Sequence, residues 1–142
     1  MRPLIVLCLL LAAPGVRAAG TDGMHYSKAE VRKELVAVVD GQLAAFRAGD
    51  FARAYGFAAQ PLRAQFTLKA FAAMVARSYP FVAHSERAEP GLPMDDGETA
   101  VLPVRIFAAG GKSANYQYQF AREGDGWHIT GVLPEQRRDP DA

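Results

Sequence analysis

Residues 27–49 read SKAEVRKELVAVVDGQLAAFRAG and predict one long amphipathic α-helix. Ser27 and Glu30 have the spacing of a capping box, in which each side chain bonds to the backbone amide of the other residue. Gly49 is placed to end the helix. At about 3.6 residues per turn, the apolar side chains fall on one stripe: Val31, Leu35, Val38, Val39 and Phe46. Such a helix needs a second layer of structure to bury this stripe.

The first 18 residues predict a secretory signal peptide that is cut after Ala18. Arg2 gives a positive start, residues 4–13 are an apolar run, and small residues precede the cut. The run is shorter than the about 20 residues that span a bilayer, so we expect no membrane insertion after cleavage. Cys8 is the only cysteine and leaves with this segment, so the exported protein has no disulfide. The expected location is periplasmic or secreted.

The exported chain predicts one domain with a balanced charge. Removing residues 1–18 from 142 leaves 124, enough for a single core. Arg2 and Arg17 are lost as well, so 14 basic side chains face 15 acidic ones, for a formal charge of −1. Neither sign is concentrated, which argues against a nucleic-acid partner. We expect a flexible leader at residues 19–26, one domain at 27–134 and a polar tail at 135–142.

Two shorter helices and then strands are predicted after the long helix. Asp50 is placed to cap the second helix, which Pro61 limits, and Thr67 to cap the third, which Tyr79-Pro80 ends. From Phe81 onward the apolar period changes to two. The predicted strands are residues 81–89, 99–107, 114–122 and a last one from residue 127, with turns at 109–112 and 124–126. The expected fold class is α+β, with three N-terminal helices on a curved four-stranded antiparallel sheet.

Alternation along the strands assigns side chains to the two faces of this sheet. The side chains expected to face inward are Leu102, Val104, Ile106, Tyr116, Tyr118, Phe120, Trp127, Ile129 and Leu133. Those expected to face outward are Asn115, Gln117, Gln119, His128 and Thr130. One face of the sheet is therefore expected to be buried in the core, and the other to be exposed to solvent or covered by a partner.

Three stretches stand out by their order and spacing: Gln42-Leu43-x-Ala45-Phe46-x-x-Gly49-Asp50 before Ala54-Tyr55, Phe71-x-x-Met74-Val75 before Tyr79-Pro80, and Gly126-Trp127-x-Ile129-x-Gly131-Val132. In these stretches the chain resembles a family of small bacterial proteins known as domain of unknown function 4864. The order of elements is similar to the cone-shaped fold of the nuclear transport factor two-like, or cystatin-like, superfamily. That resemblance implies a fold with no activity attached, because the superfamily includes isomerases, dehydratases, ligand binders and dimerisation modules.

No motif for a metal, a cofactor or a nucleophile is present in the sequence. The histidines His25, His84 and His128 are scattered and have no cysteine pair beside them. Residues 110–112, Gly-Gly-Lys, lack the outer glycine of a phosphate loop and the helix that follows it. Ser78, Ser85 and Ser113 lack the Gly-x-Ser-x-Gly context of a hydrolase nucleophile. We therefore expect no cofactor and no metal.

An isomerase-like site is the sharper enzyme hypothesis, and the sequence does not favour it. Cone-shaped enzymes place an acid or base at an inward strand position, yet none of the inward positions here is a carboxylate. Asp40 falls on the outer side of the long helix. Only the phenols could act, with Arg105 or His84 if the strand register is shifted by one residue.

Gln42 is a polar residue in the middle of the apolar helix stripe, about 20° from the axis of Val31 at 100° per residue. An unpaired amide there costs about 1–3 kcal/mol, so we expect a partner, either a loop carbonyl or the hydroxyl of Tyr55 or Tyr79. In the alternative interpretation the amide lines a pocket and orients a ligand, with Tyr116, Tyr118 and Trp127 as walls. The candidate ligand-binding residues are Gln42, Tyr55, Tyr79, Tyr116, Tyr118 and Trp127.

Three functions follow from these patterns. The leading one is a non-enzymatic binding or accessory protein whose aromatic-lined cavity takes a small apolar or aromatic ligand. The second is an isomerase or dehydratase acting on a small molecule. The third is an interaction module that dimerises through the outer sheet face. The neutral polar row on that face predicts a monomer or a weak homodimer.

Overall fold

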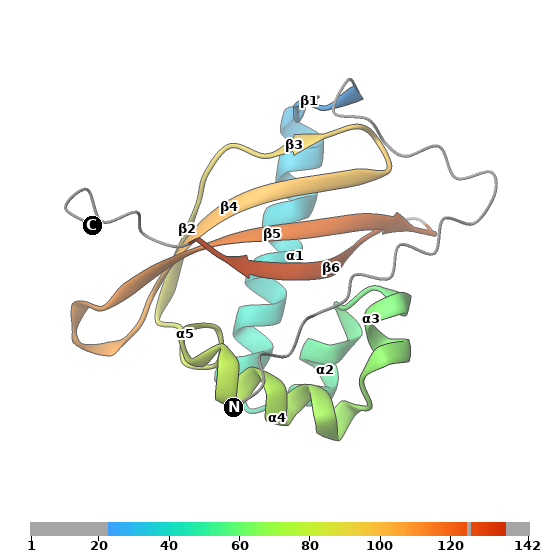
Figure 1. Ribbon diagram of the computed structural model, residues 1–142. Helices are drawn as coiled ribbons and strands as arrows, with labels where there is room; N and C mark the ends of the chain where they lie inside the picture. The colour runs from blue at the N-terminus through green and yellow to red at the C-terminus, as the bar shows by residue number, and fades with distance from the viewer. Residues whose placement is uncertain (1–22, 125, 136–142) are drawn as a thin grey trace, which may run out of the picture.

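The long predicted helix is α1, Ala29–Arg47, and it lies across one face of an antiparallel sheet in the computed structural model (Figure 1). The structure describes residues 23–124 and 126–135. The predicted signal peptide, the first part of the leader and nearly all of the polar tail lie outside these residues. Within the described part, no helix is long and apolar enough to cross a membrane.

The start of α1 differs from the predicted capping box. Lys28 is the N-cap residue and makes no side-chain cap hydrogen bond. The Ser27 hydroxyl instead donates to the Asp95 carboxylate at 2.5 Å, and the Ser27 amide donates to the Pro93 carbonyl. The Asp95 carboxylate is a buried, charged acceptor, so this hydrogen bond is stronger than the neutral one in which the Ser27 oxygen would accept from the Glu30 amide.

Four shorter helices follow α1, where two were predicted. They are α2 (Phe51–Gly56), α3 (Gln60–Gln65), α4 (Leu68–Ser78) and α5 (Pro80–Ala83). The predicted caps are confirmed, since Asp50 accepts from the Arg53 amide at 3.0 Å and Thr67 from the Ala70 amide at 3.1 Å. Helices α3 and α5 were missed because a proline lies in the first turn of each, where its missing N–H is not needed. The strand predicted from Phe81 is wrong up to Glu86.

The sheet of the described residues has six strands instead of four, and all pair antiparallel. They are β1 (His25–Tyr26), β2 (Arg87–Pro90), β3 (Met94–Asp95), β4 (Thr99–Phe107), β5 (Ser113–Glu123) and β6 (Gly126–Pro134). The order is β1-β3-β4-β5-β6, with β2 also paired to β4. Strand β4 has its predicted bounds. Strand β1 uses two residues of the predicted leader and pairs with β3.

A β-bulge in β6 changes the face of the residues that follow it. Gln119 is opposite Gly131 and Phe120 is opposite Ile129, so Thr130 is the extra residue. One inserted residue reverses the alternation of a strand. The Leu133 side chain, predicted to face inward, therefore lies on the outer face and is 47% exposed.

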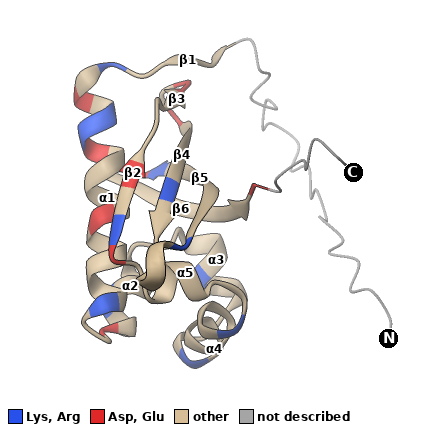
Figure 2. Ribbon diagram, turned by 90° about the vertical axis from the view of Figure 1, so that its left-hand side faces the viewer, with Lys and Arg blue, Asp and Glu red and all other residues tan. Residues whose placement is uncertain are grey.

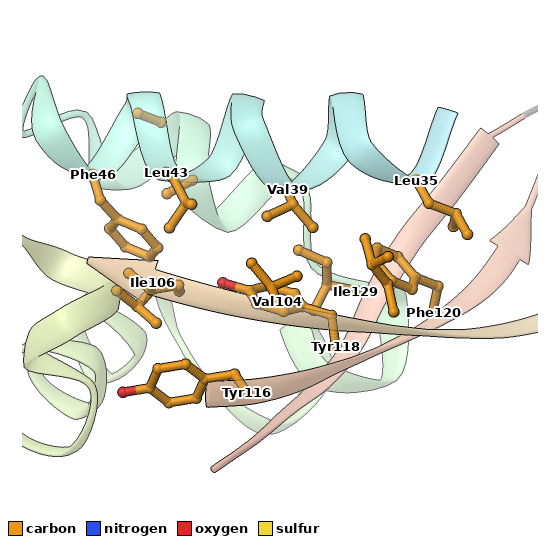
Figure 3. Close-up of a cluster of buried hydrophobic side chains, with 14 of the residues drawn as sticks. Leu35, Val39, Leu43, Phe46, Val104, Ile106, Tyr116, Tyr118, Phe120 and Ile129 are labelled. Atoms are coloured by element: carbon orange, nitrogen blue, oxygen red, sulfur yellow. The ribbon is translucent and has the colours of Figure 1, made fainter. Parts of the chain in front are cut away.

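The core lies between α1 and the inner face of the sheet. Figure 3 shows Leu35, Val39, Leu43 and Phe46 of α1 above the sheet residues. Apart from Leu133, every side chain predicted to face inward is buried. Val31 and Val38 are only half-buried, while Gln42 and Leu43 take the central positions. Helices α2 to α5 lie beside the β6 edge, near the C-terminal end of α1 (Figure 1).

Candidate functional site

A pocket of about 210 Å³ lies between the C-terminal half of α1, helices α3 to α5 and strand β6. Its walls come from segments far apart in the sequence, and most of its lining is apolar. The lining residues are Gln42, Phe46, Leu62, Phe66, Phe71, Met74, Val75, Tyr79, Val82, Ile129, Gly131 and Val132.

Hydrogen bonds to the backbone hold the walls of this pocket in place. The Tyr55 hydroxyl lies 2.8 Å from the Arg63 carbonyl and 2.5 Å from the Phe66 carbonyl, which fixes the end of α3. The Tyr79 hydroxyl donates to the Val132 carbonyl at 2.8 Å and ties the end of α4 to β6. The Ala59 amide donates to the Ile129 carbonyl at 2.7 Å, just before α3 begins. The pocket is thus bounded by segments anchored at both ends.

The carbonyl oxygen of the Gln42 side chain is a buried polar atom of the pocket wall without a hydrogen-bond partner among the described residues. The side chain as a whole is 4% exposed. The expected partners are occupied elsewhere, since Tyr55 donates to α3 carbonyls and Tyr79 to Val132. The prediction of a partner for Gln42 is therefore wrong. A buried polar group without a partner requires an explanation, and an occupant of the pocket would supply one.

The pocket suits an uncharged molecule. None of its lining residues is Asp, Glu, His, Lys or Arg. Burial raises the pKa of the Tyr79 phenol above its ordinary value, so this group is neutral at physiological pH. A buried charge without a partner is strongly disfavoured in such surroundings. Tyr79 is the one titratable side chain among the described residues of this lining, and its hydroxyl proton is engaged with the Val132 carbonyl.

Two of the six predicted site residues, Gln42 and Tyr79, line this pocket. Tyr55 lies behind the wall and holds α3. The other three belong to the layer under α1. Tyr118 is fully buried and its hydroxyl has no partner among the described residues, while the Trp127 indole N–H donates to Glu34 at 3.1 Å. Tyr116 is buried with its ring centroid 6.3 Å from that of Tyr79.

The apolar half of the pocket was not anticipated as a site. Phe71, Met74 and Val75 have the helical spacing that is typical of a buried core face. Leu62 and Phe66 belong to α3 and its C-cap, a helix that sequence analysis did not predict. The apolar spacing of α4 was the available signal, but spacing does not distinguish a packed face from one that borders a cavity.

No group of three or more His, Cys, Asp or Glu side chains in the described residues could hold a metal ion. The fold and the pocket together define a small α+β domain with an uncharged, largely apolar cavity beside its sheet edge. The chain belongs to the family described as Domain of unknown function (DUF4864), whose family model matches residues 28–142. A search of curated proteins finds no match to the chain.

Proposed function

We propose that this protein is a non-enzymatic binding protein that holds a small, uncharged, mostly apolar molecule in the pocket between α1, α4 and β6. The observation that carries the proposal is the unpaired carbonyl oxygen of Gln42 in a largely apolar wall. A well-formed apolar cavity with few polar groups is the usual form of a small-molecule site. Rotation of the terminal amide exchanges its oxygen and nitrogen, so Gln42 can accept from or donate to an occupant.

The volume of the pocket limits the size of the occupant. An engineered apolar cavity of about 150 Å³ holds benzene. The pocket here is about 210 Å³, which suits a single aromatic ring with a short substituent or a small branched aliphatic molecule. The aromatic rings of the wall (Phe46, Phe66, Phe71) favour a ring over a flexible chain.

The test compares phenol with toluene, which has the same shape without the hydroxyl group. Both are titrated into wild type and Gln42→Leu. The substitution should weaken phenol binding about fivefold, or about 1 kcal/mol, and leave toluene binding equal or tighter. Gln119→Leu is the matched control, because Gln119 faces the outer side of the sheet and does not line the pocket.

Thermal melts of the same variants without ligand complete the test. Because the Gln42 carbonyl oxygen has no partner to strand, Gln42→Leu should melt at the wild-type temperature or above it. A loss of stability of about 1–3 kcal/mol with unchanged phenol binding would show that the amide has a structural role, and would overturn the proposal.

We further propose that the protein acts after export, in the periplasm or outside the cell, and that its fold is the cone of the nuclear transport factor two-like superfamily. The support for export is Arg2, the apolar run at residues 4–13 and Ala18. The support for the superfamily is a long helix across one face of an antiparallel sheet, with a pocket at one end. Intact mass of exported protein should begin at Ala19 or within a residue or two; full-length protein retained in the cytoplasm would contradict export.

A further inference from the structure

A second cavity, of about 480 Å³, opens at the C-terminal end of α1 and has a different chemistry. Its apolar side is formed by Phe46, Phe51 and Ala83, and its polar side by Arg47, His84 and Ser85. The rings of Phe46 and Phe51 meet edge to face, with centroids 5.7 Å apart. Phe46 lines both this cavity and the pocket described above, but no other residue is shared.

The polar side of this cavity is rich in hydrogen-bond donors. Arg47 Nη1 donates to the Ser85 hydroxyl oxygen at 2.9 Å, and Ser85 is only 3% exposed. A serine hydroxyl that accepts from a guanidinium still has its own proton to donate, and a guanidinium has five N–H groups. Both residues line one cavity beside an apolar surface, and each has an N–H or O–H group left to donate.

The charge of Arg47 is not neutralised by any described carboxylate. No salt bridge within 4.0 Å joins Arg47 to an acidic group among residues 23–124 and 126–135. The acid nearest in sequence to Arg47 is Asp50, which caps α2, and the one nearest to Ser85 is Glu86, which is exposed. The C-terminus of α1 adds about half a negative charge, which the full charge of the guanidinium outweighs.

We propose that this cavity binds a small organic carboxylate, with its carboxylate on Arg47 and Ser85 and its apolar body against Phe46 and Phe51. Arginine is the side chain best matched to a carboxylate, because its planar fork can donate two parallel hydrogen bonds. The adjacent phenylalanine rings distinguish this site from a simple anion site. The inference is independent of the proposed function, because Gln42 does not line this cavity.

Benzoate is the probe, and benzamide is its neutral counterpart of the same shape. Because benzamide also fits the uncharged pocket described above, calorimetric titration compares the two probes by what Arg47→Gln changes: affinity for benzoate should fall and affinity for benzamide should not. Arg47→Gln should weaken benzoate binding at least tenfold, and Ser85→Ala about threefold. Arg53→Gln is the matched control, since Arg53 is an exposed arginine on α2 outside the cavity, and it should change nothing. Gln42→Leu should also leave benzoate binding unchanged.

Equal binding of benzoate by wild type and Arg47→Gln would overturn the inference, as would an equal loss of benzamide binding in that variant. Acetate or inorganic phosphate binding as tightly as benzoate would also overturn it, because the apolar side would then contribute nothing. A thermal melt of each variant checks folding. If Arg47→Gln does not fold, Ser85→Ala decides the question with the same two probes, since this variant keeps the charge of Arg47.

Discussion

The two faces of the sheet are made from alternate residues of the same strands, yet they have opposite surroundings. Figure 2 shows α1 along one face, while no helix of residues 23–124 and 126–135 covers the other face. On β5, Tyr118 and Phe120 are at most 1% exposed, whereas their neighbours Gln117 and Gln119 are half-buried on the outer side. The difference shows that alternation along a strand is enough to assign side chains to the buried or the outer face of the sheet. A single bulge, as in β6, moves the residues after it to the opposite face.

The outer face is not uniformly polar. Tyr26 pairs with Met94 and is 70% exposed, and Leu133 pairs with Gln117 and is 47% exposed. Arg105 and Asn115 face each other on the same side, near the other end of β4. Such a mixture of amides, charges and single apolar groups is typical of a weak, polar interface, and it differs from the apolar interface of an obligate dimer.

The largest difference between the faces should appear when adjacent residues are truncated. Phe120→Ala removes a buried ring from the core and should lower the free energy of unfolding by about 3–5 kcal/mol. Gln119→Ala, one residue away on the outer face, should change it by about 0.5 kcal/mol or less. Urea denaturation of both variants measures the difference. Equal losses would contradict the assignment of faces at the bulge.

A smaller effect should distinguish two tyrosines on the inner side. Tyr118→Phe removes a buried hydroxyl that has no partner among the described residues, so stability should hold or rise by about 1 kcal/mol. Tyr79→Phe removes the hydrogen bond to the Val132 carbonyl and should lower stability by about 1 kcal/mol. Thermal melts at neutral pH compare the two variants. A Tyr118→Phe protein less stable than Tyr79→Phe would reverse this ranking.

Tyr118 and Tyr79 also make the stability of the fold depend on pH. Burial raises the pKa of the Tyr118 phenol, and of Tyr79, above the ordinary value of 10.0. Above about pH 10 the unfolded phenols lose their protons first, so the unfolded state binds fewer protons and stability falls as pH rises. Denaturation between about pH 9 and 11 should show this fall, and it should be shallower in Tyr118→Phe. An unchanged slope in that variant would contradict the buried state of its phenol.

The sequence predicted the elements in which apolar residues recur at a regular spacing. It missed elements whose boundaries no such spacing marks. Strand β4 has its predicted bounds because apolar residues alternate through it. Helices α3 and α5 were missed because Pro61 and Pro80 were interpreted as helix ends, although each lies in the first turn of a new helix. The misplaced face of Leu133 has the same kind of cause, since no local pattern marks the bulge before it.

The candidate site was predicted only in part, for a related reason. Helical geometry placed Gln42 on the inward stripe, and the structure agrees. The same reasoning could not tell which aromatic groups surround it. Tyr118 and Trp127 are inward residues too, but they lie under the packed part of α1, while the pocket forms where α4 meets β6. Position along the helix axis depends on tertiary contacts that a one-dimensional pattern does not contain.

The smallest effect on folding should come from the centre of the outer face. Gln117 lies on β5 between Pro103 of β4 and Leu133 of β6. Gln117→Arg should change the free energy of unfolding by about 0.5 kcal/mol or less, because the new charge remains in solvent.

A two-fold dimer through this face would bring the two arginines together near its axis, so the substitution should abolish any weak association. Light scattering at low micromolar concentration should find a monomer or a weak dimer for wild type and only a monomer for the variant. Ala37→Arg, on the exposed side of α1, adds the same charge elsewhere and should leave the association state unchanged. A stable dimer that survives Gln117→Arg would show that the outer face of the sheet takes no part in assembly.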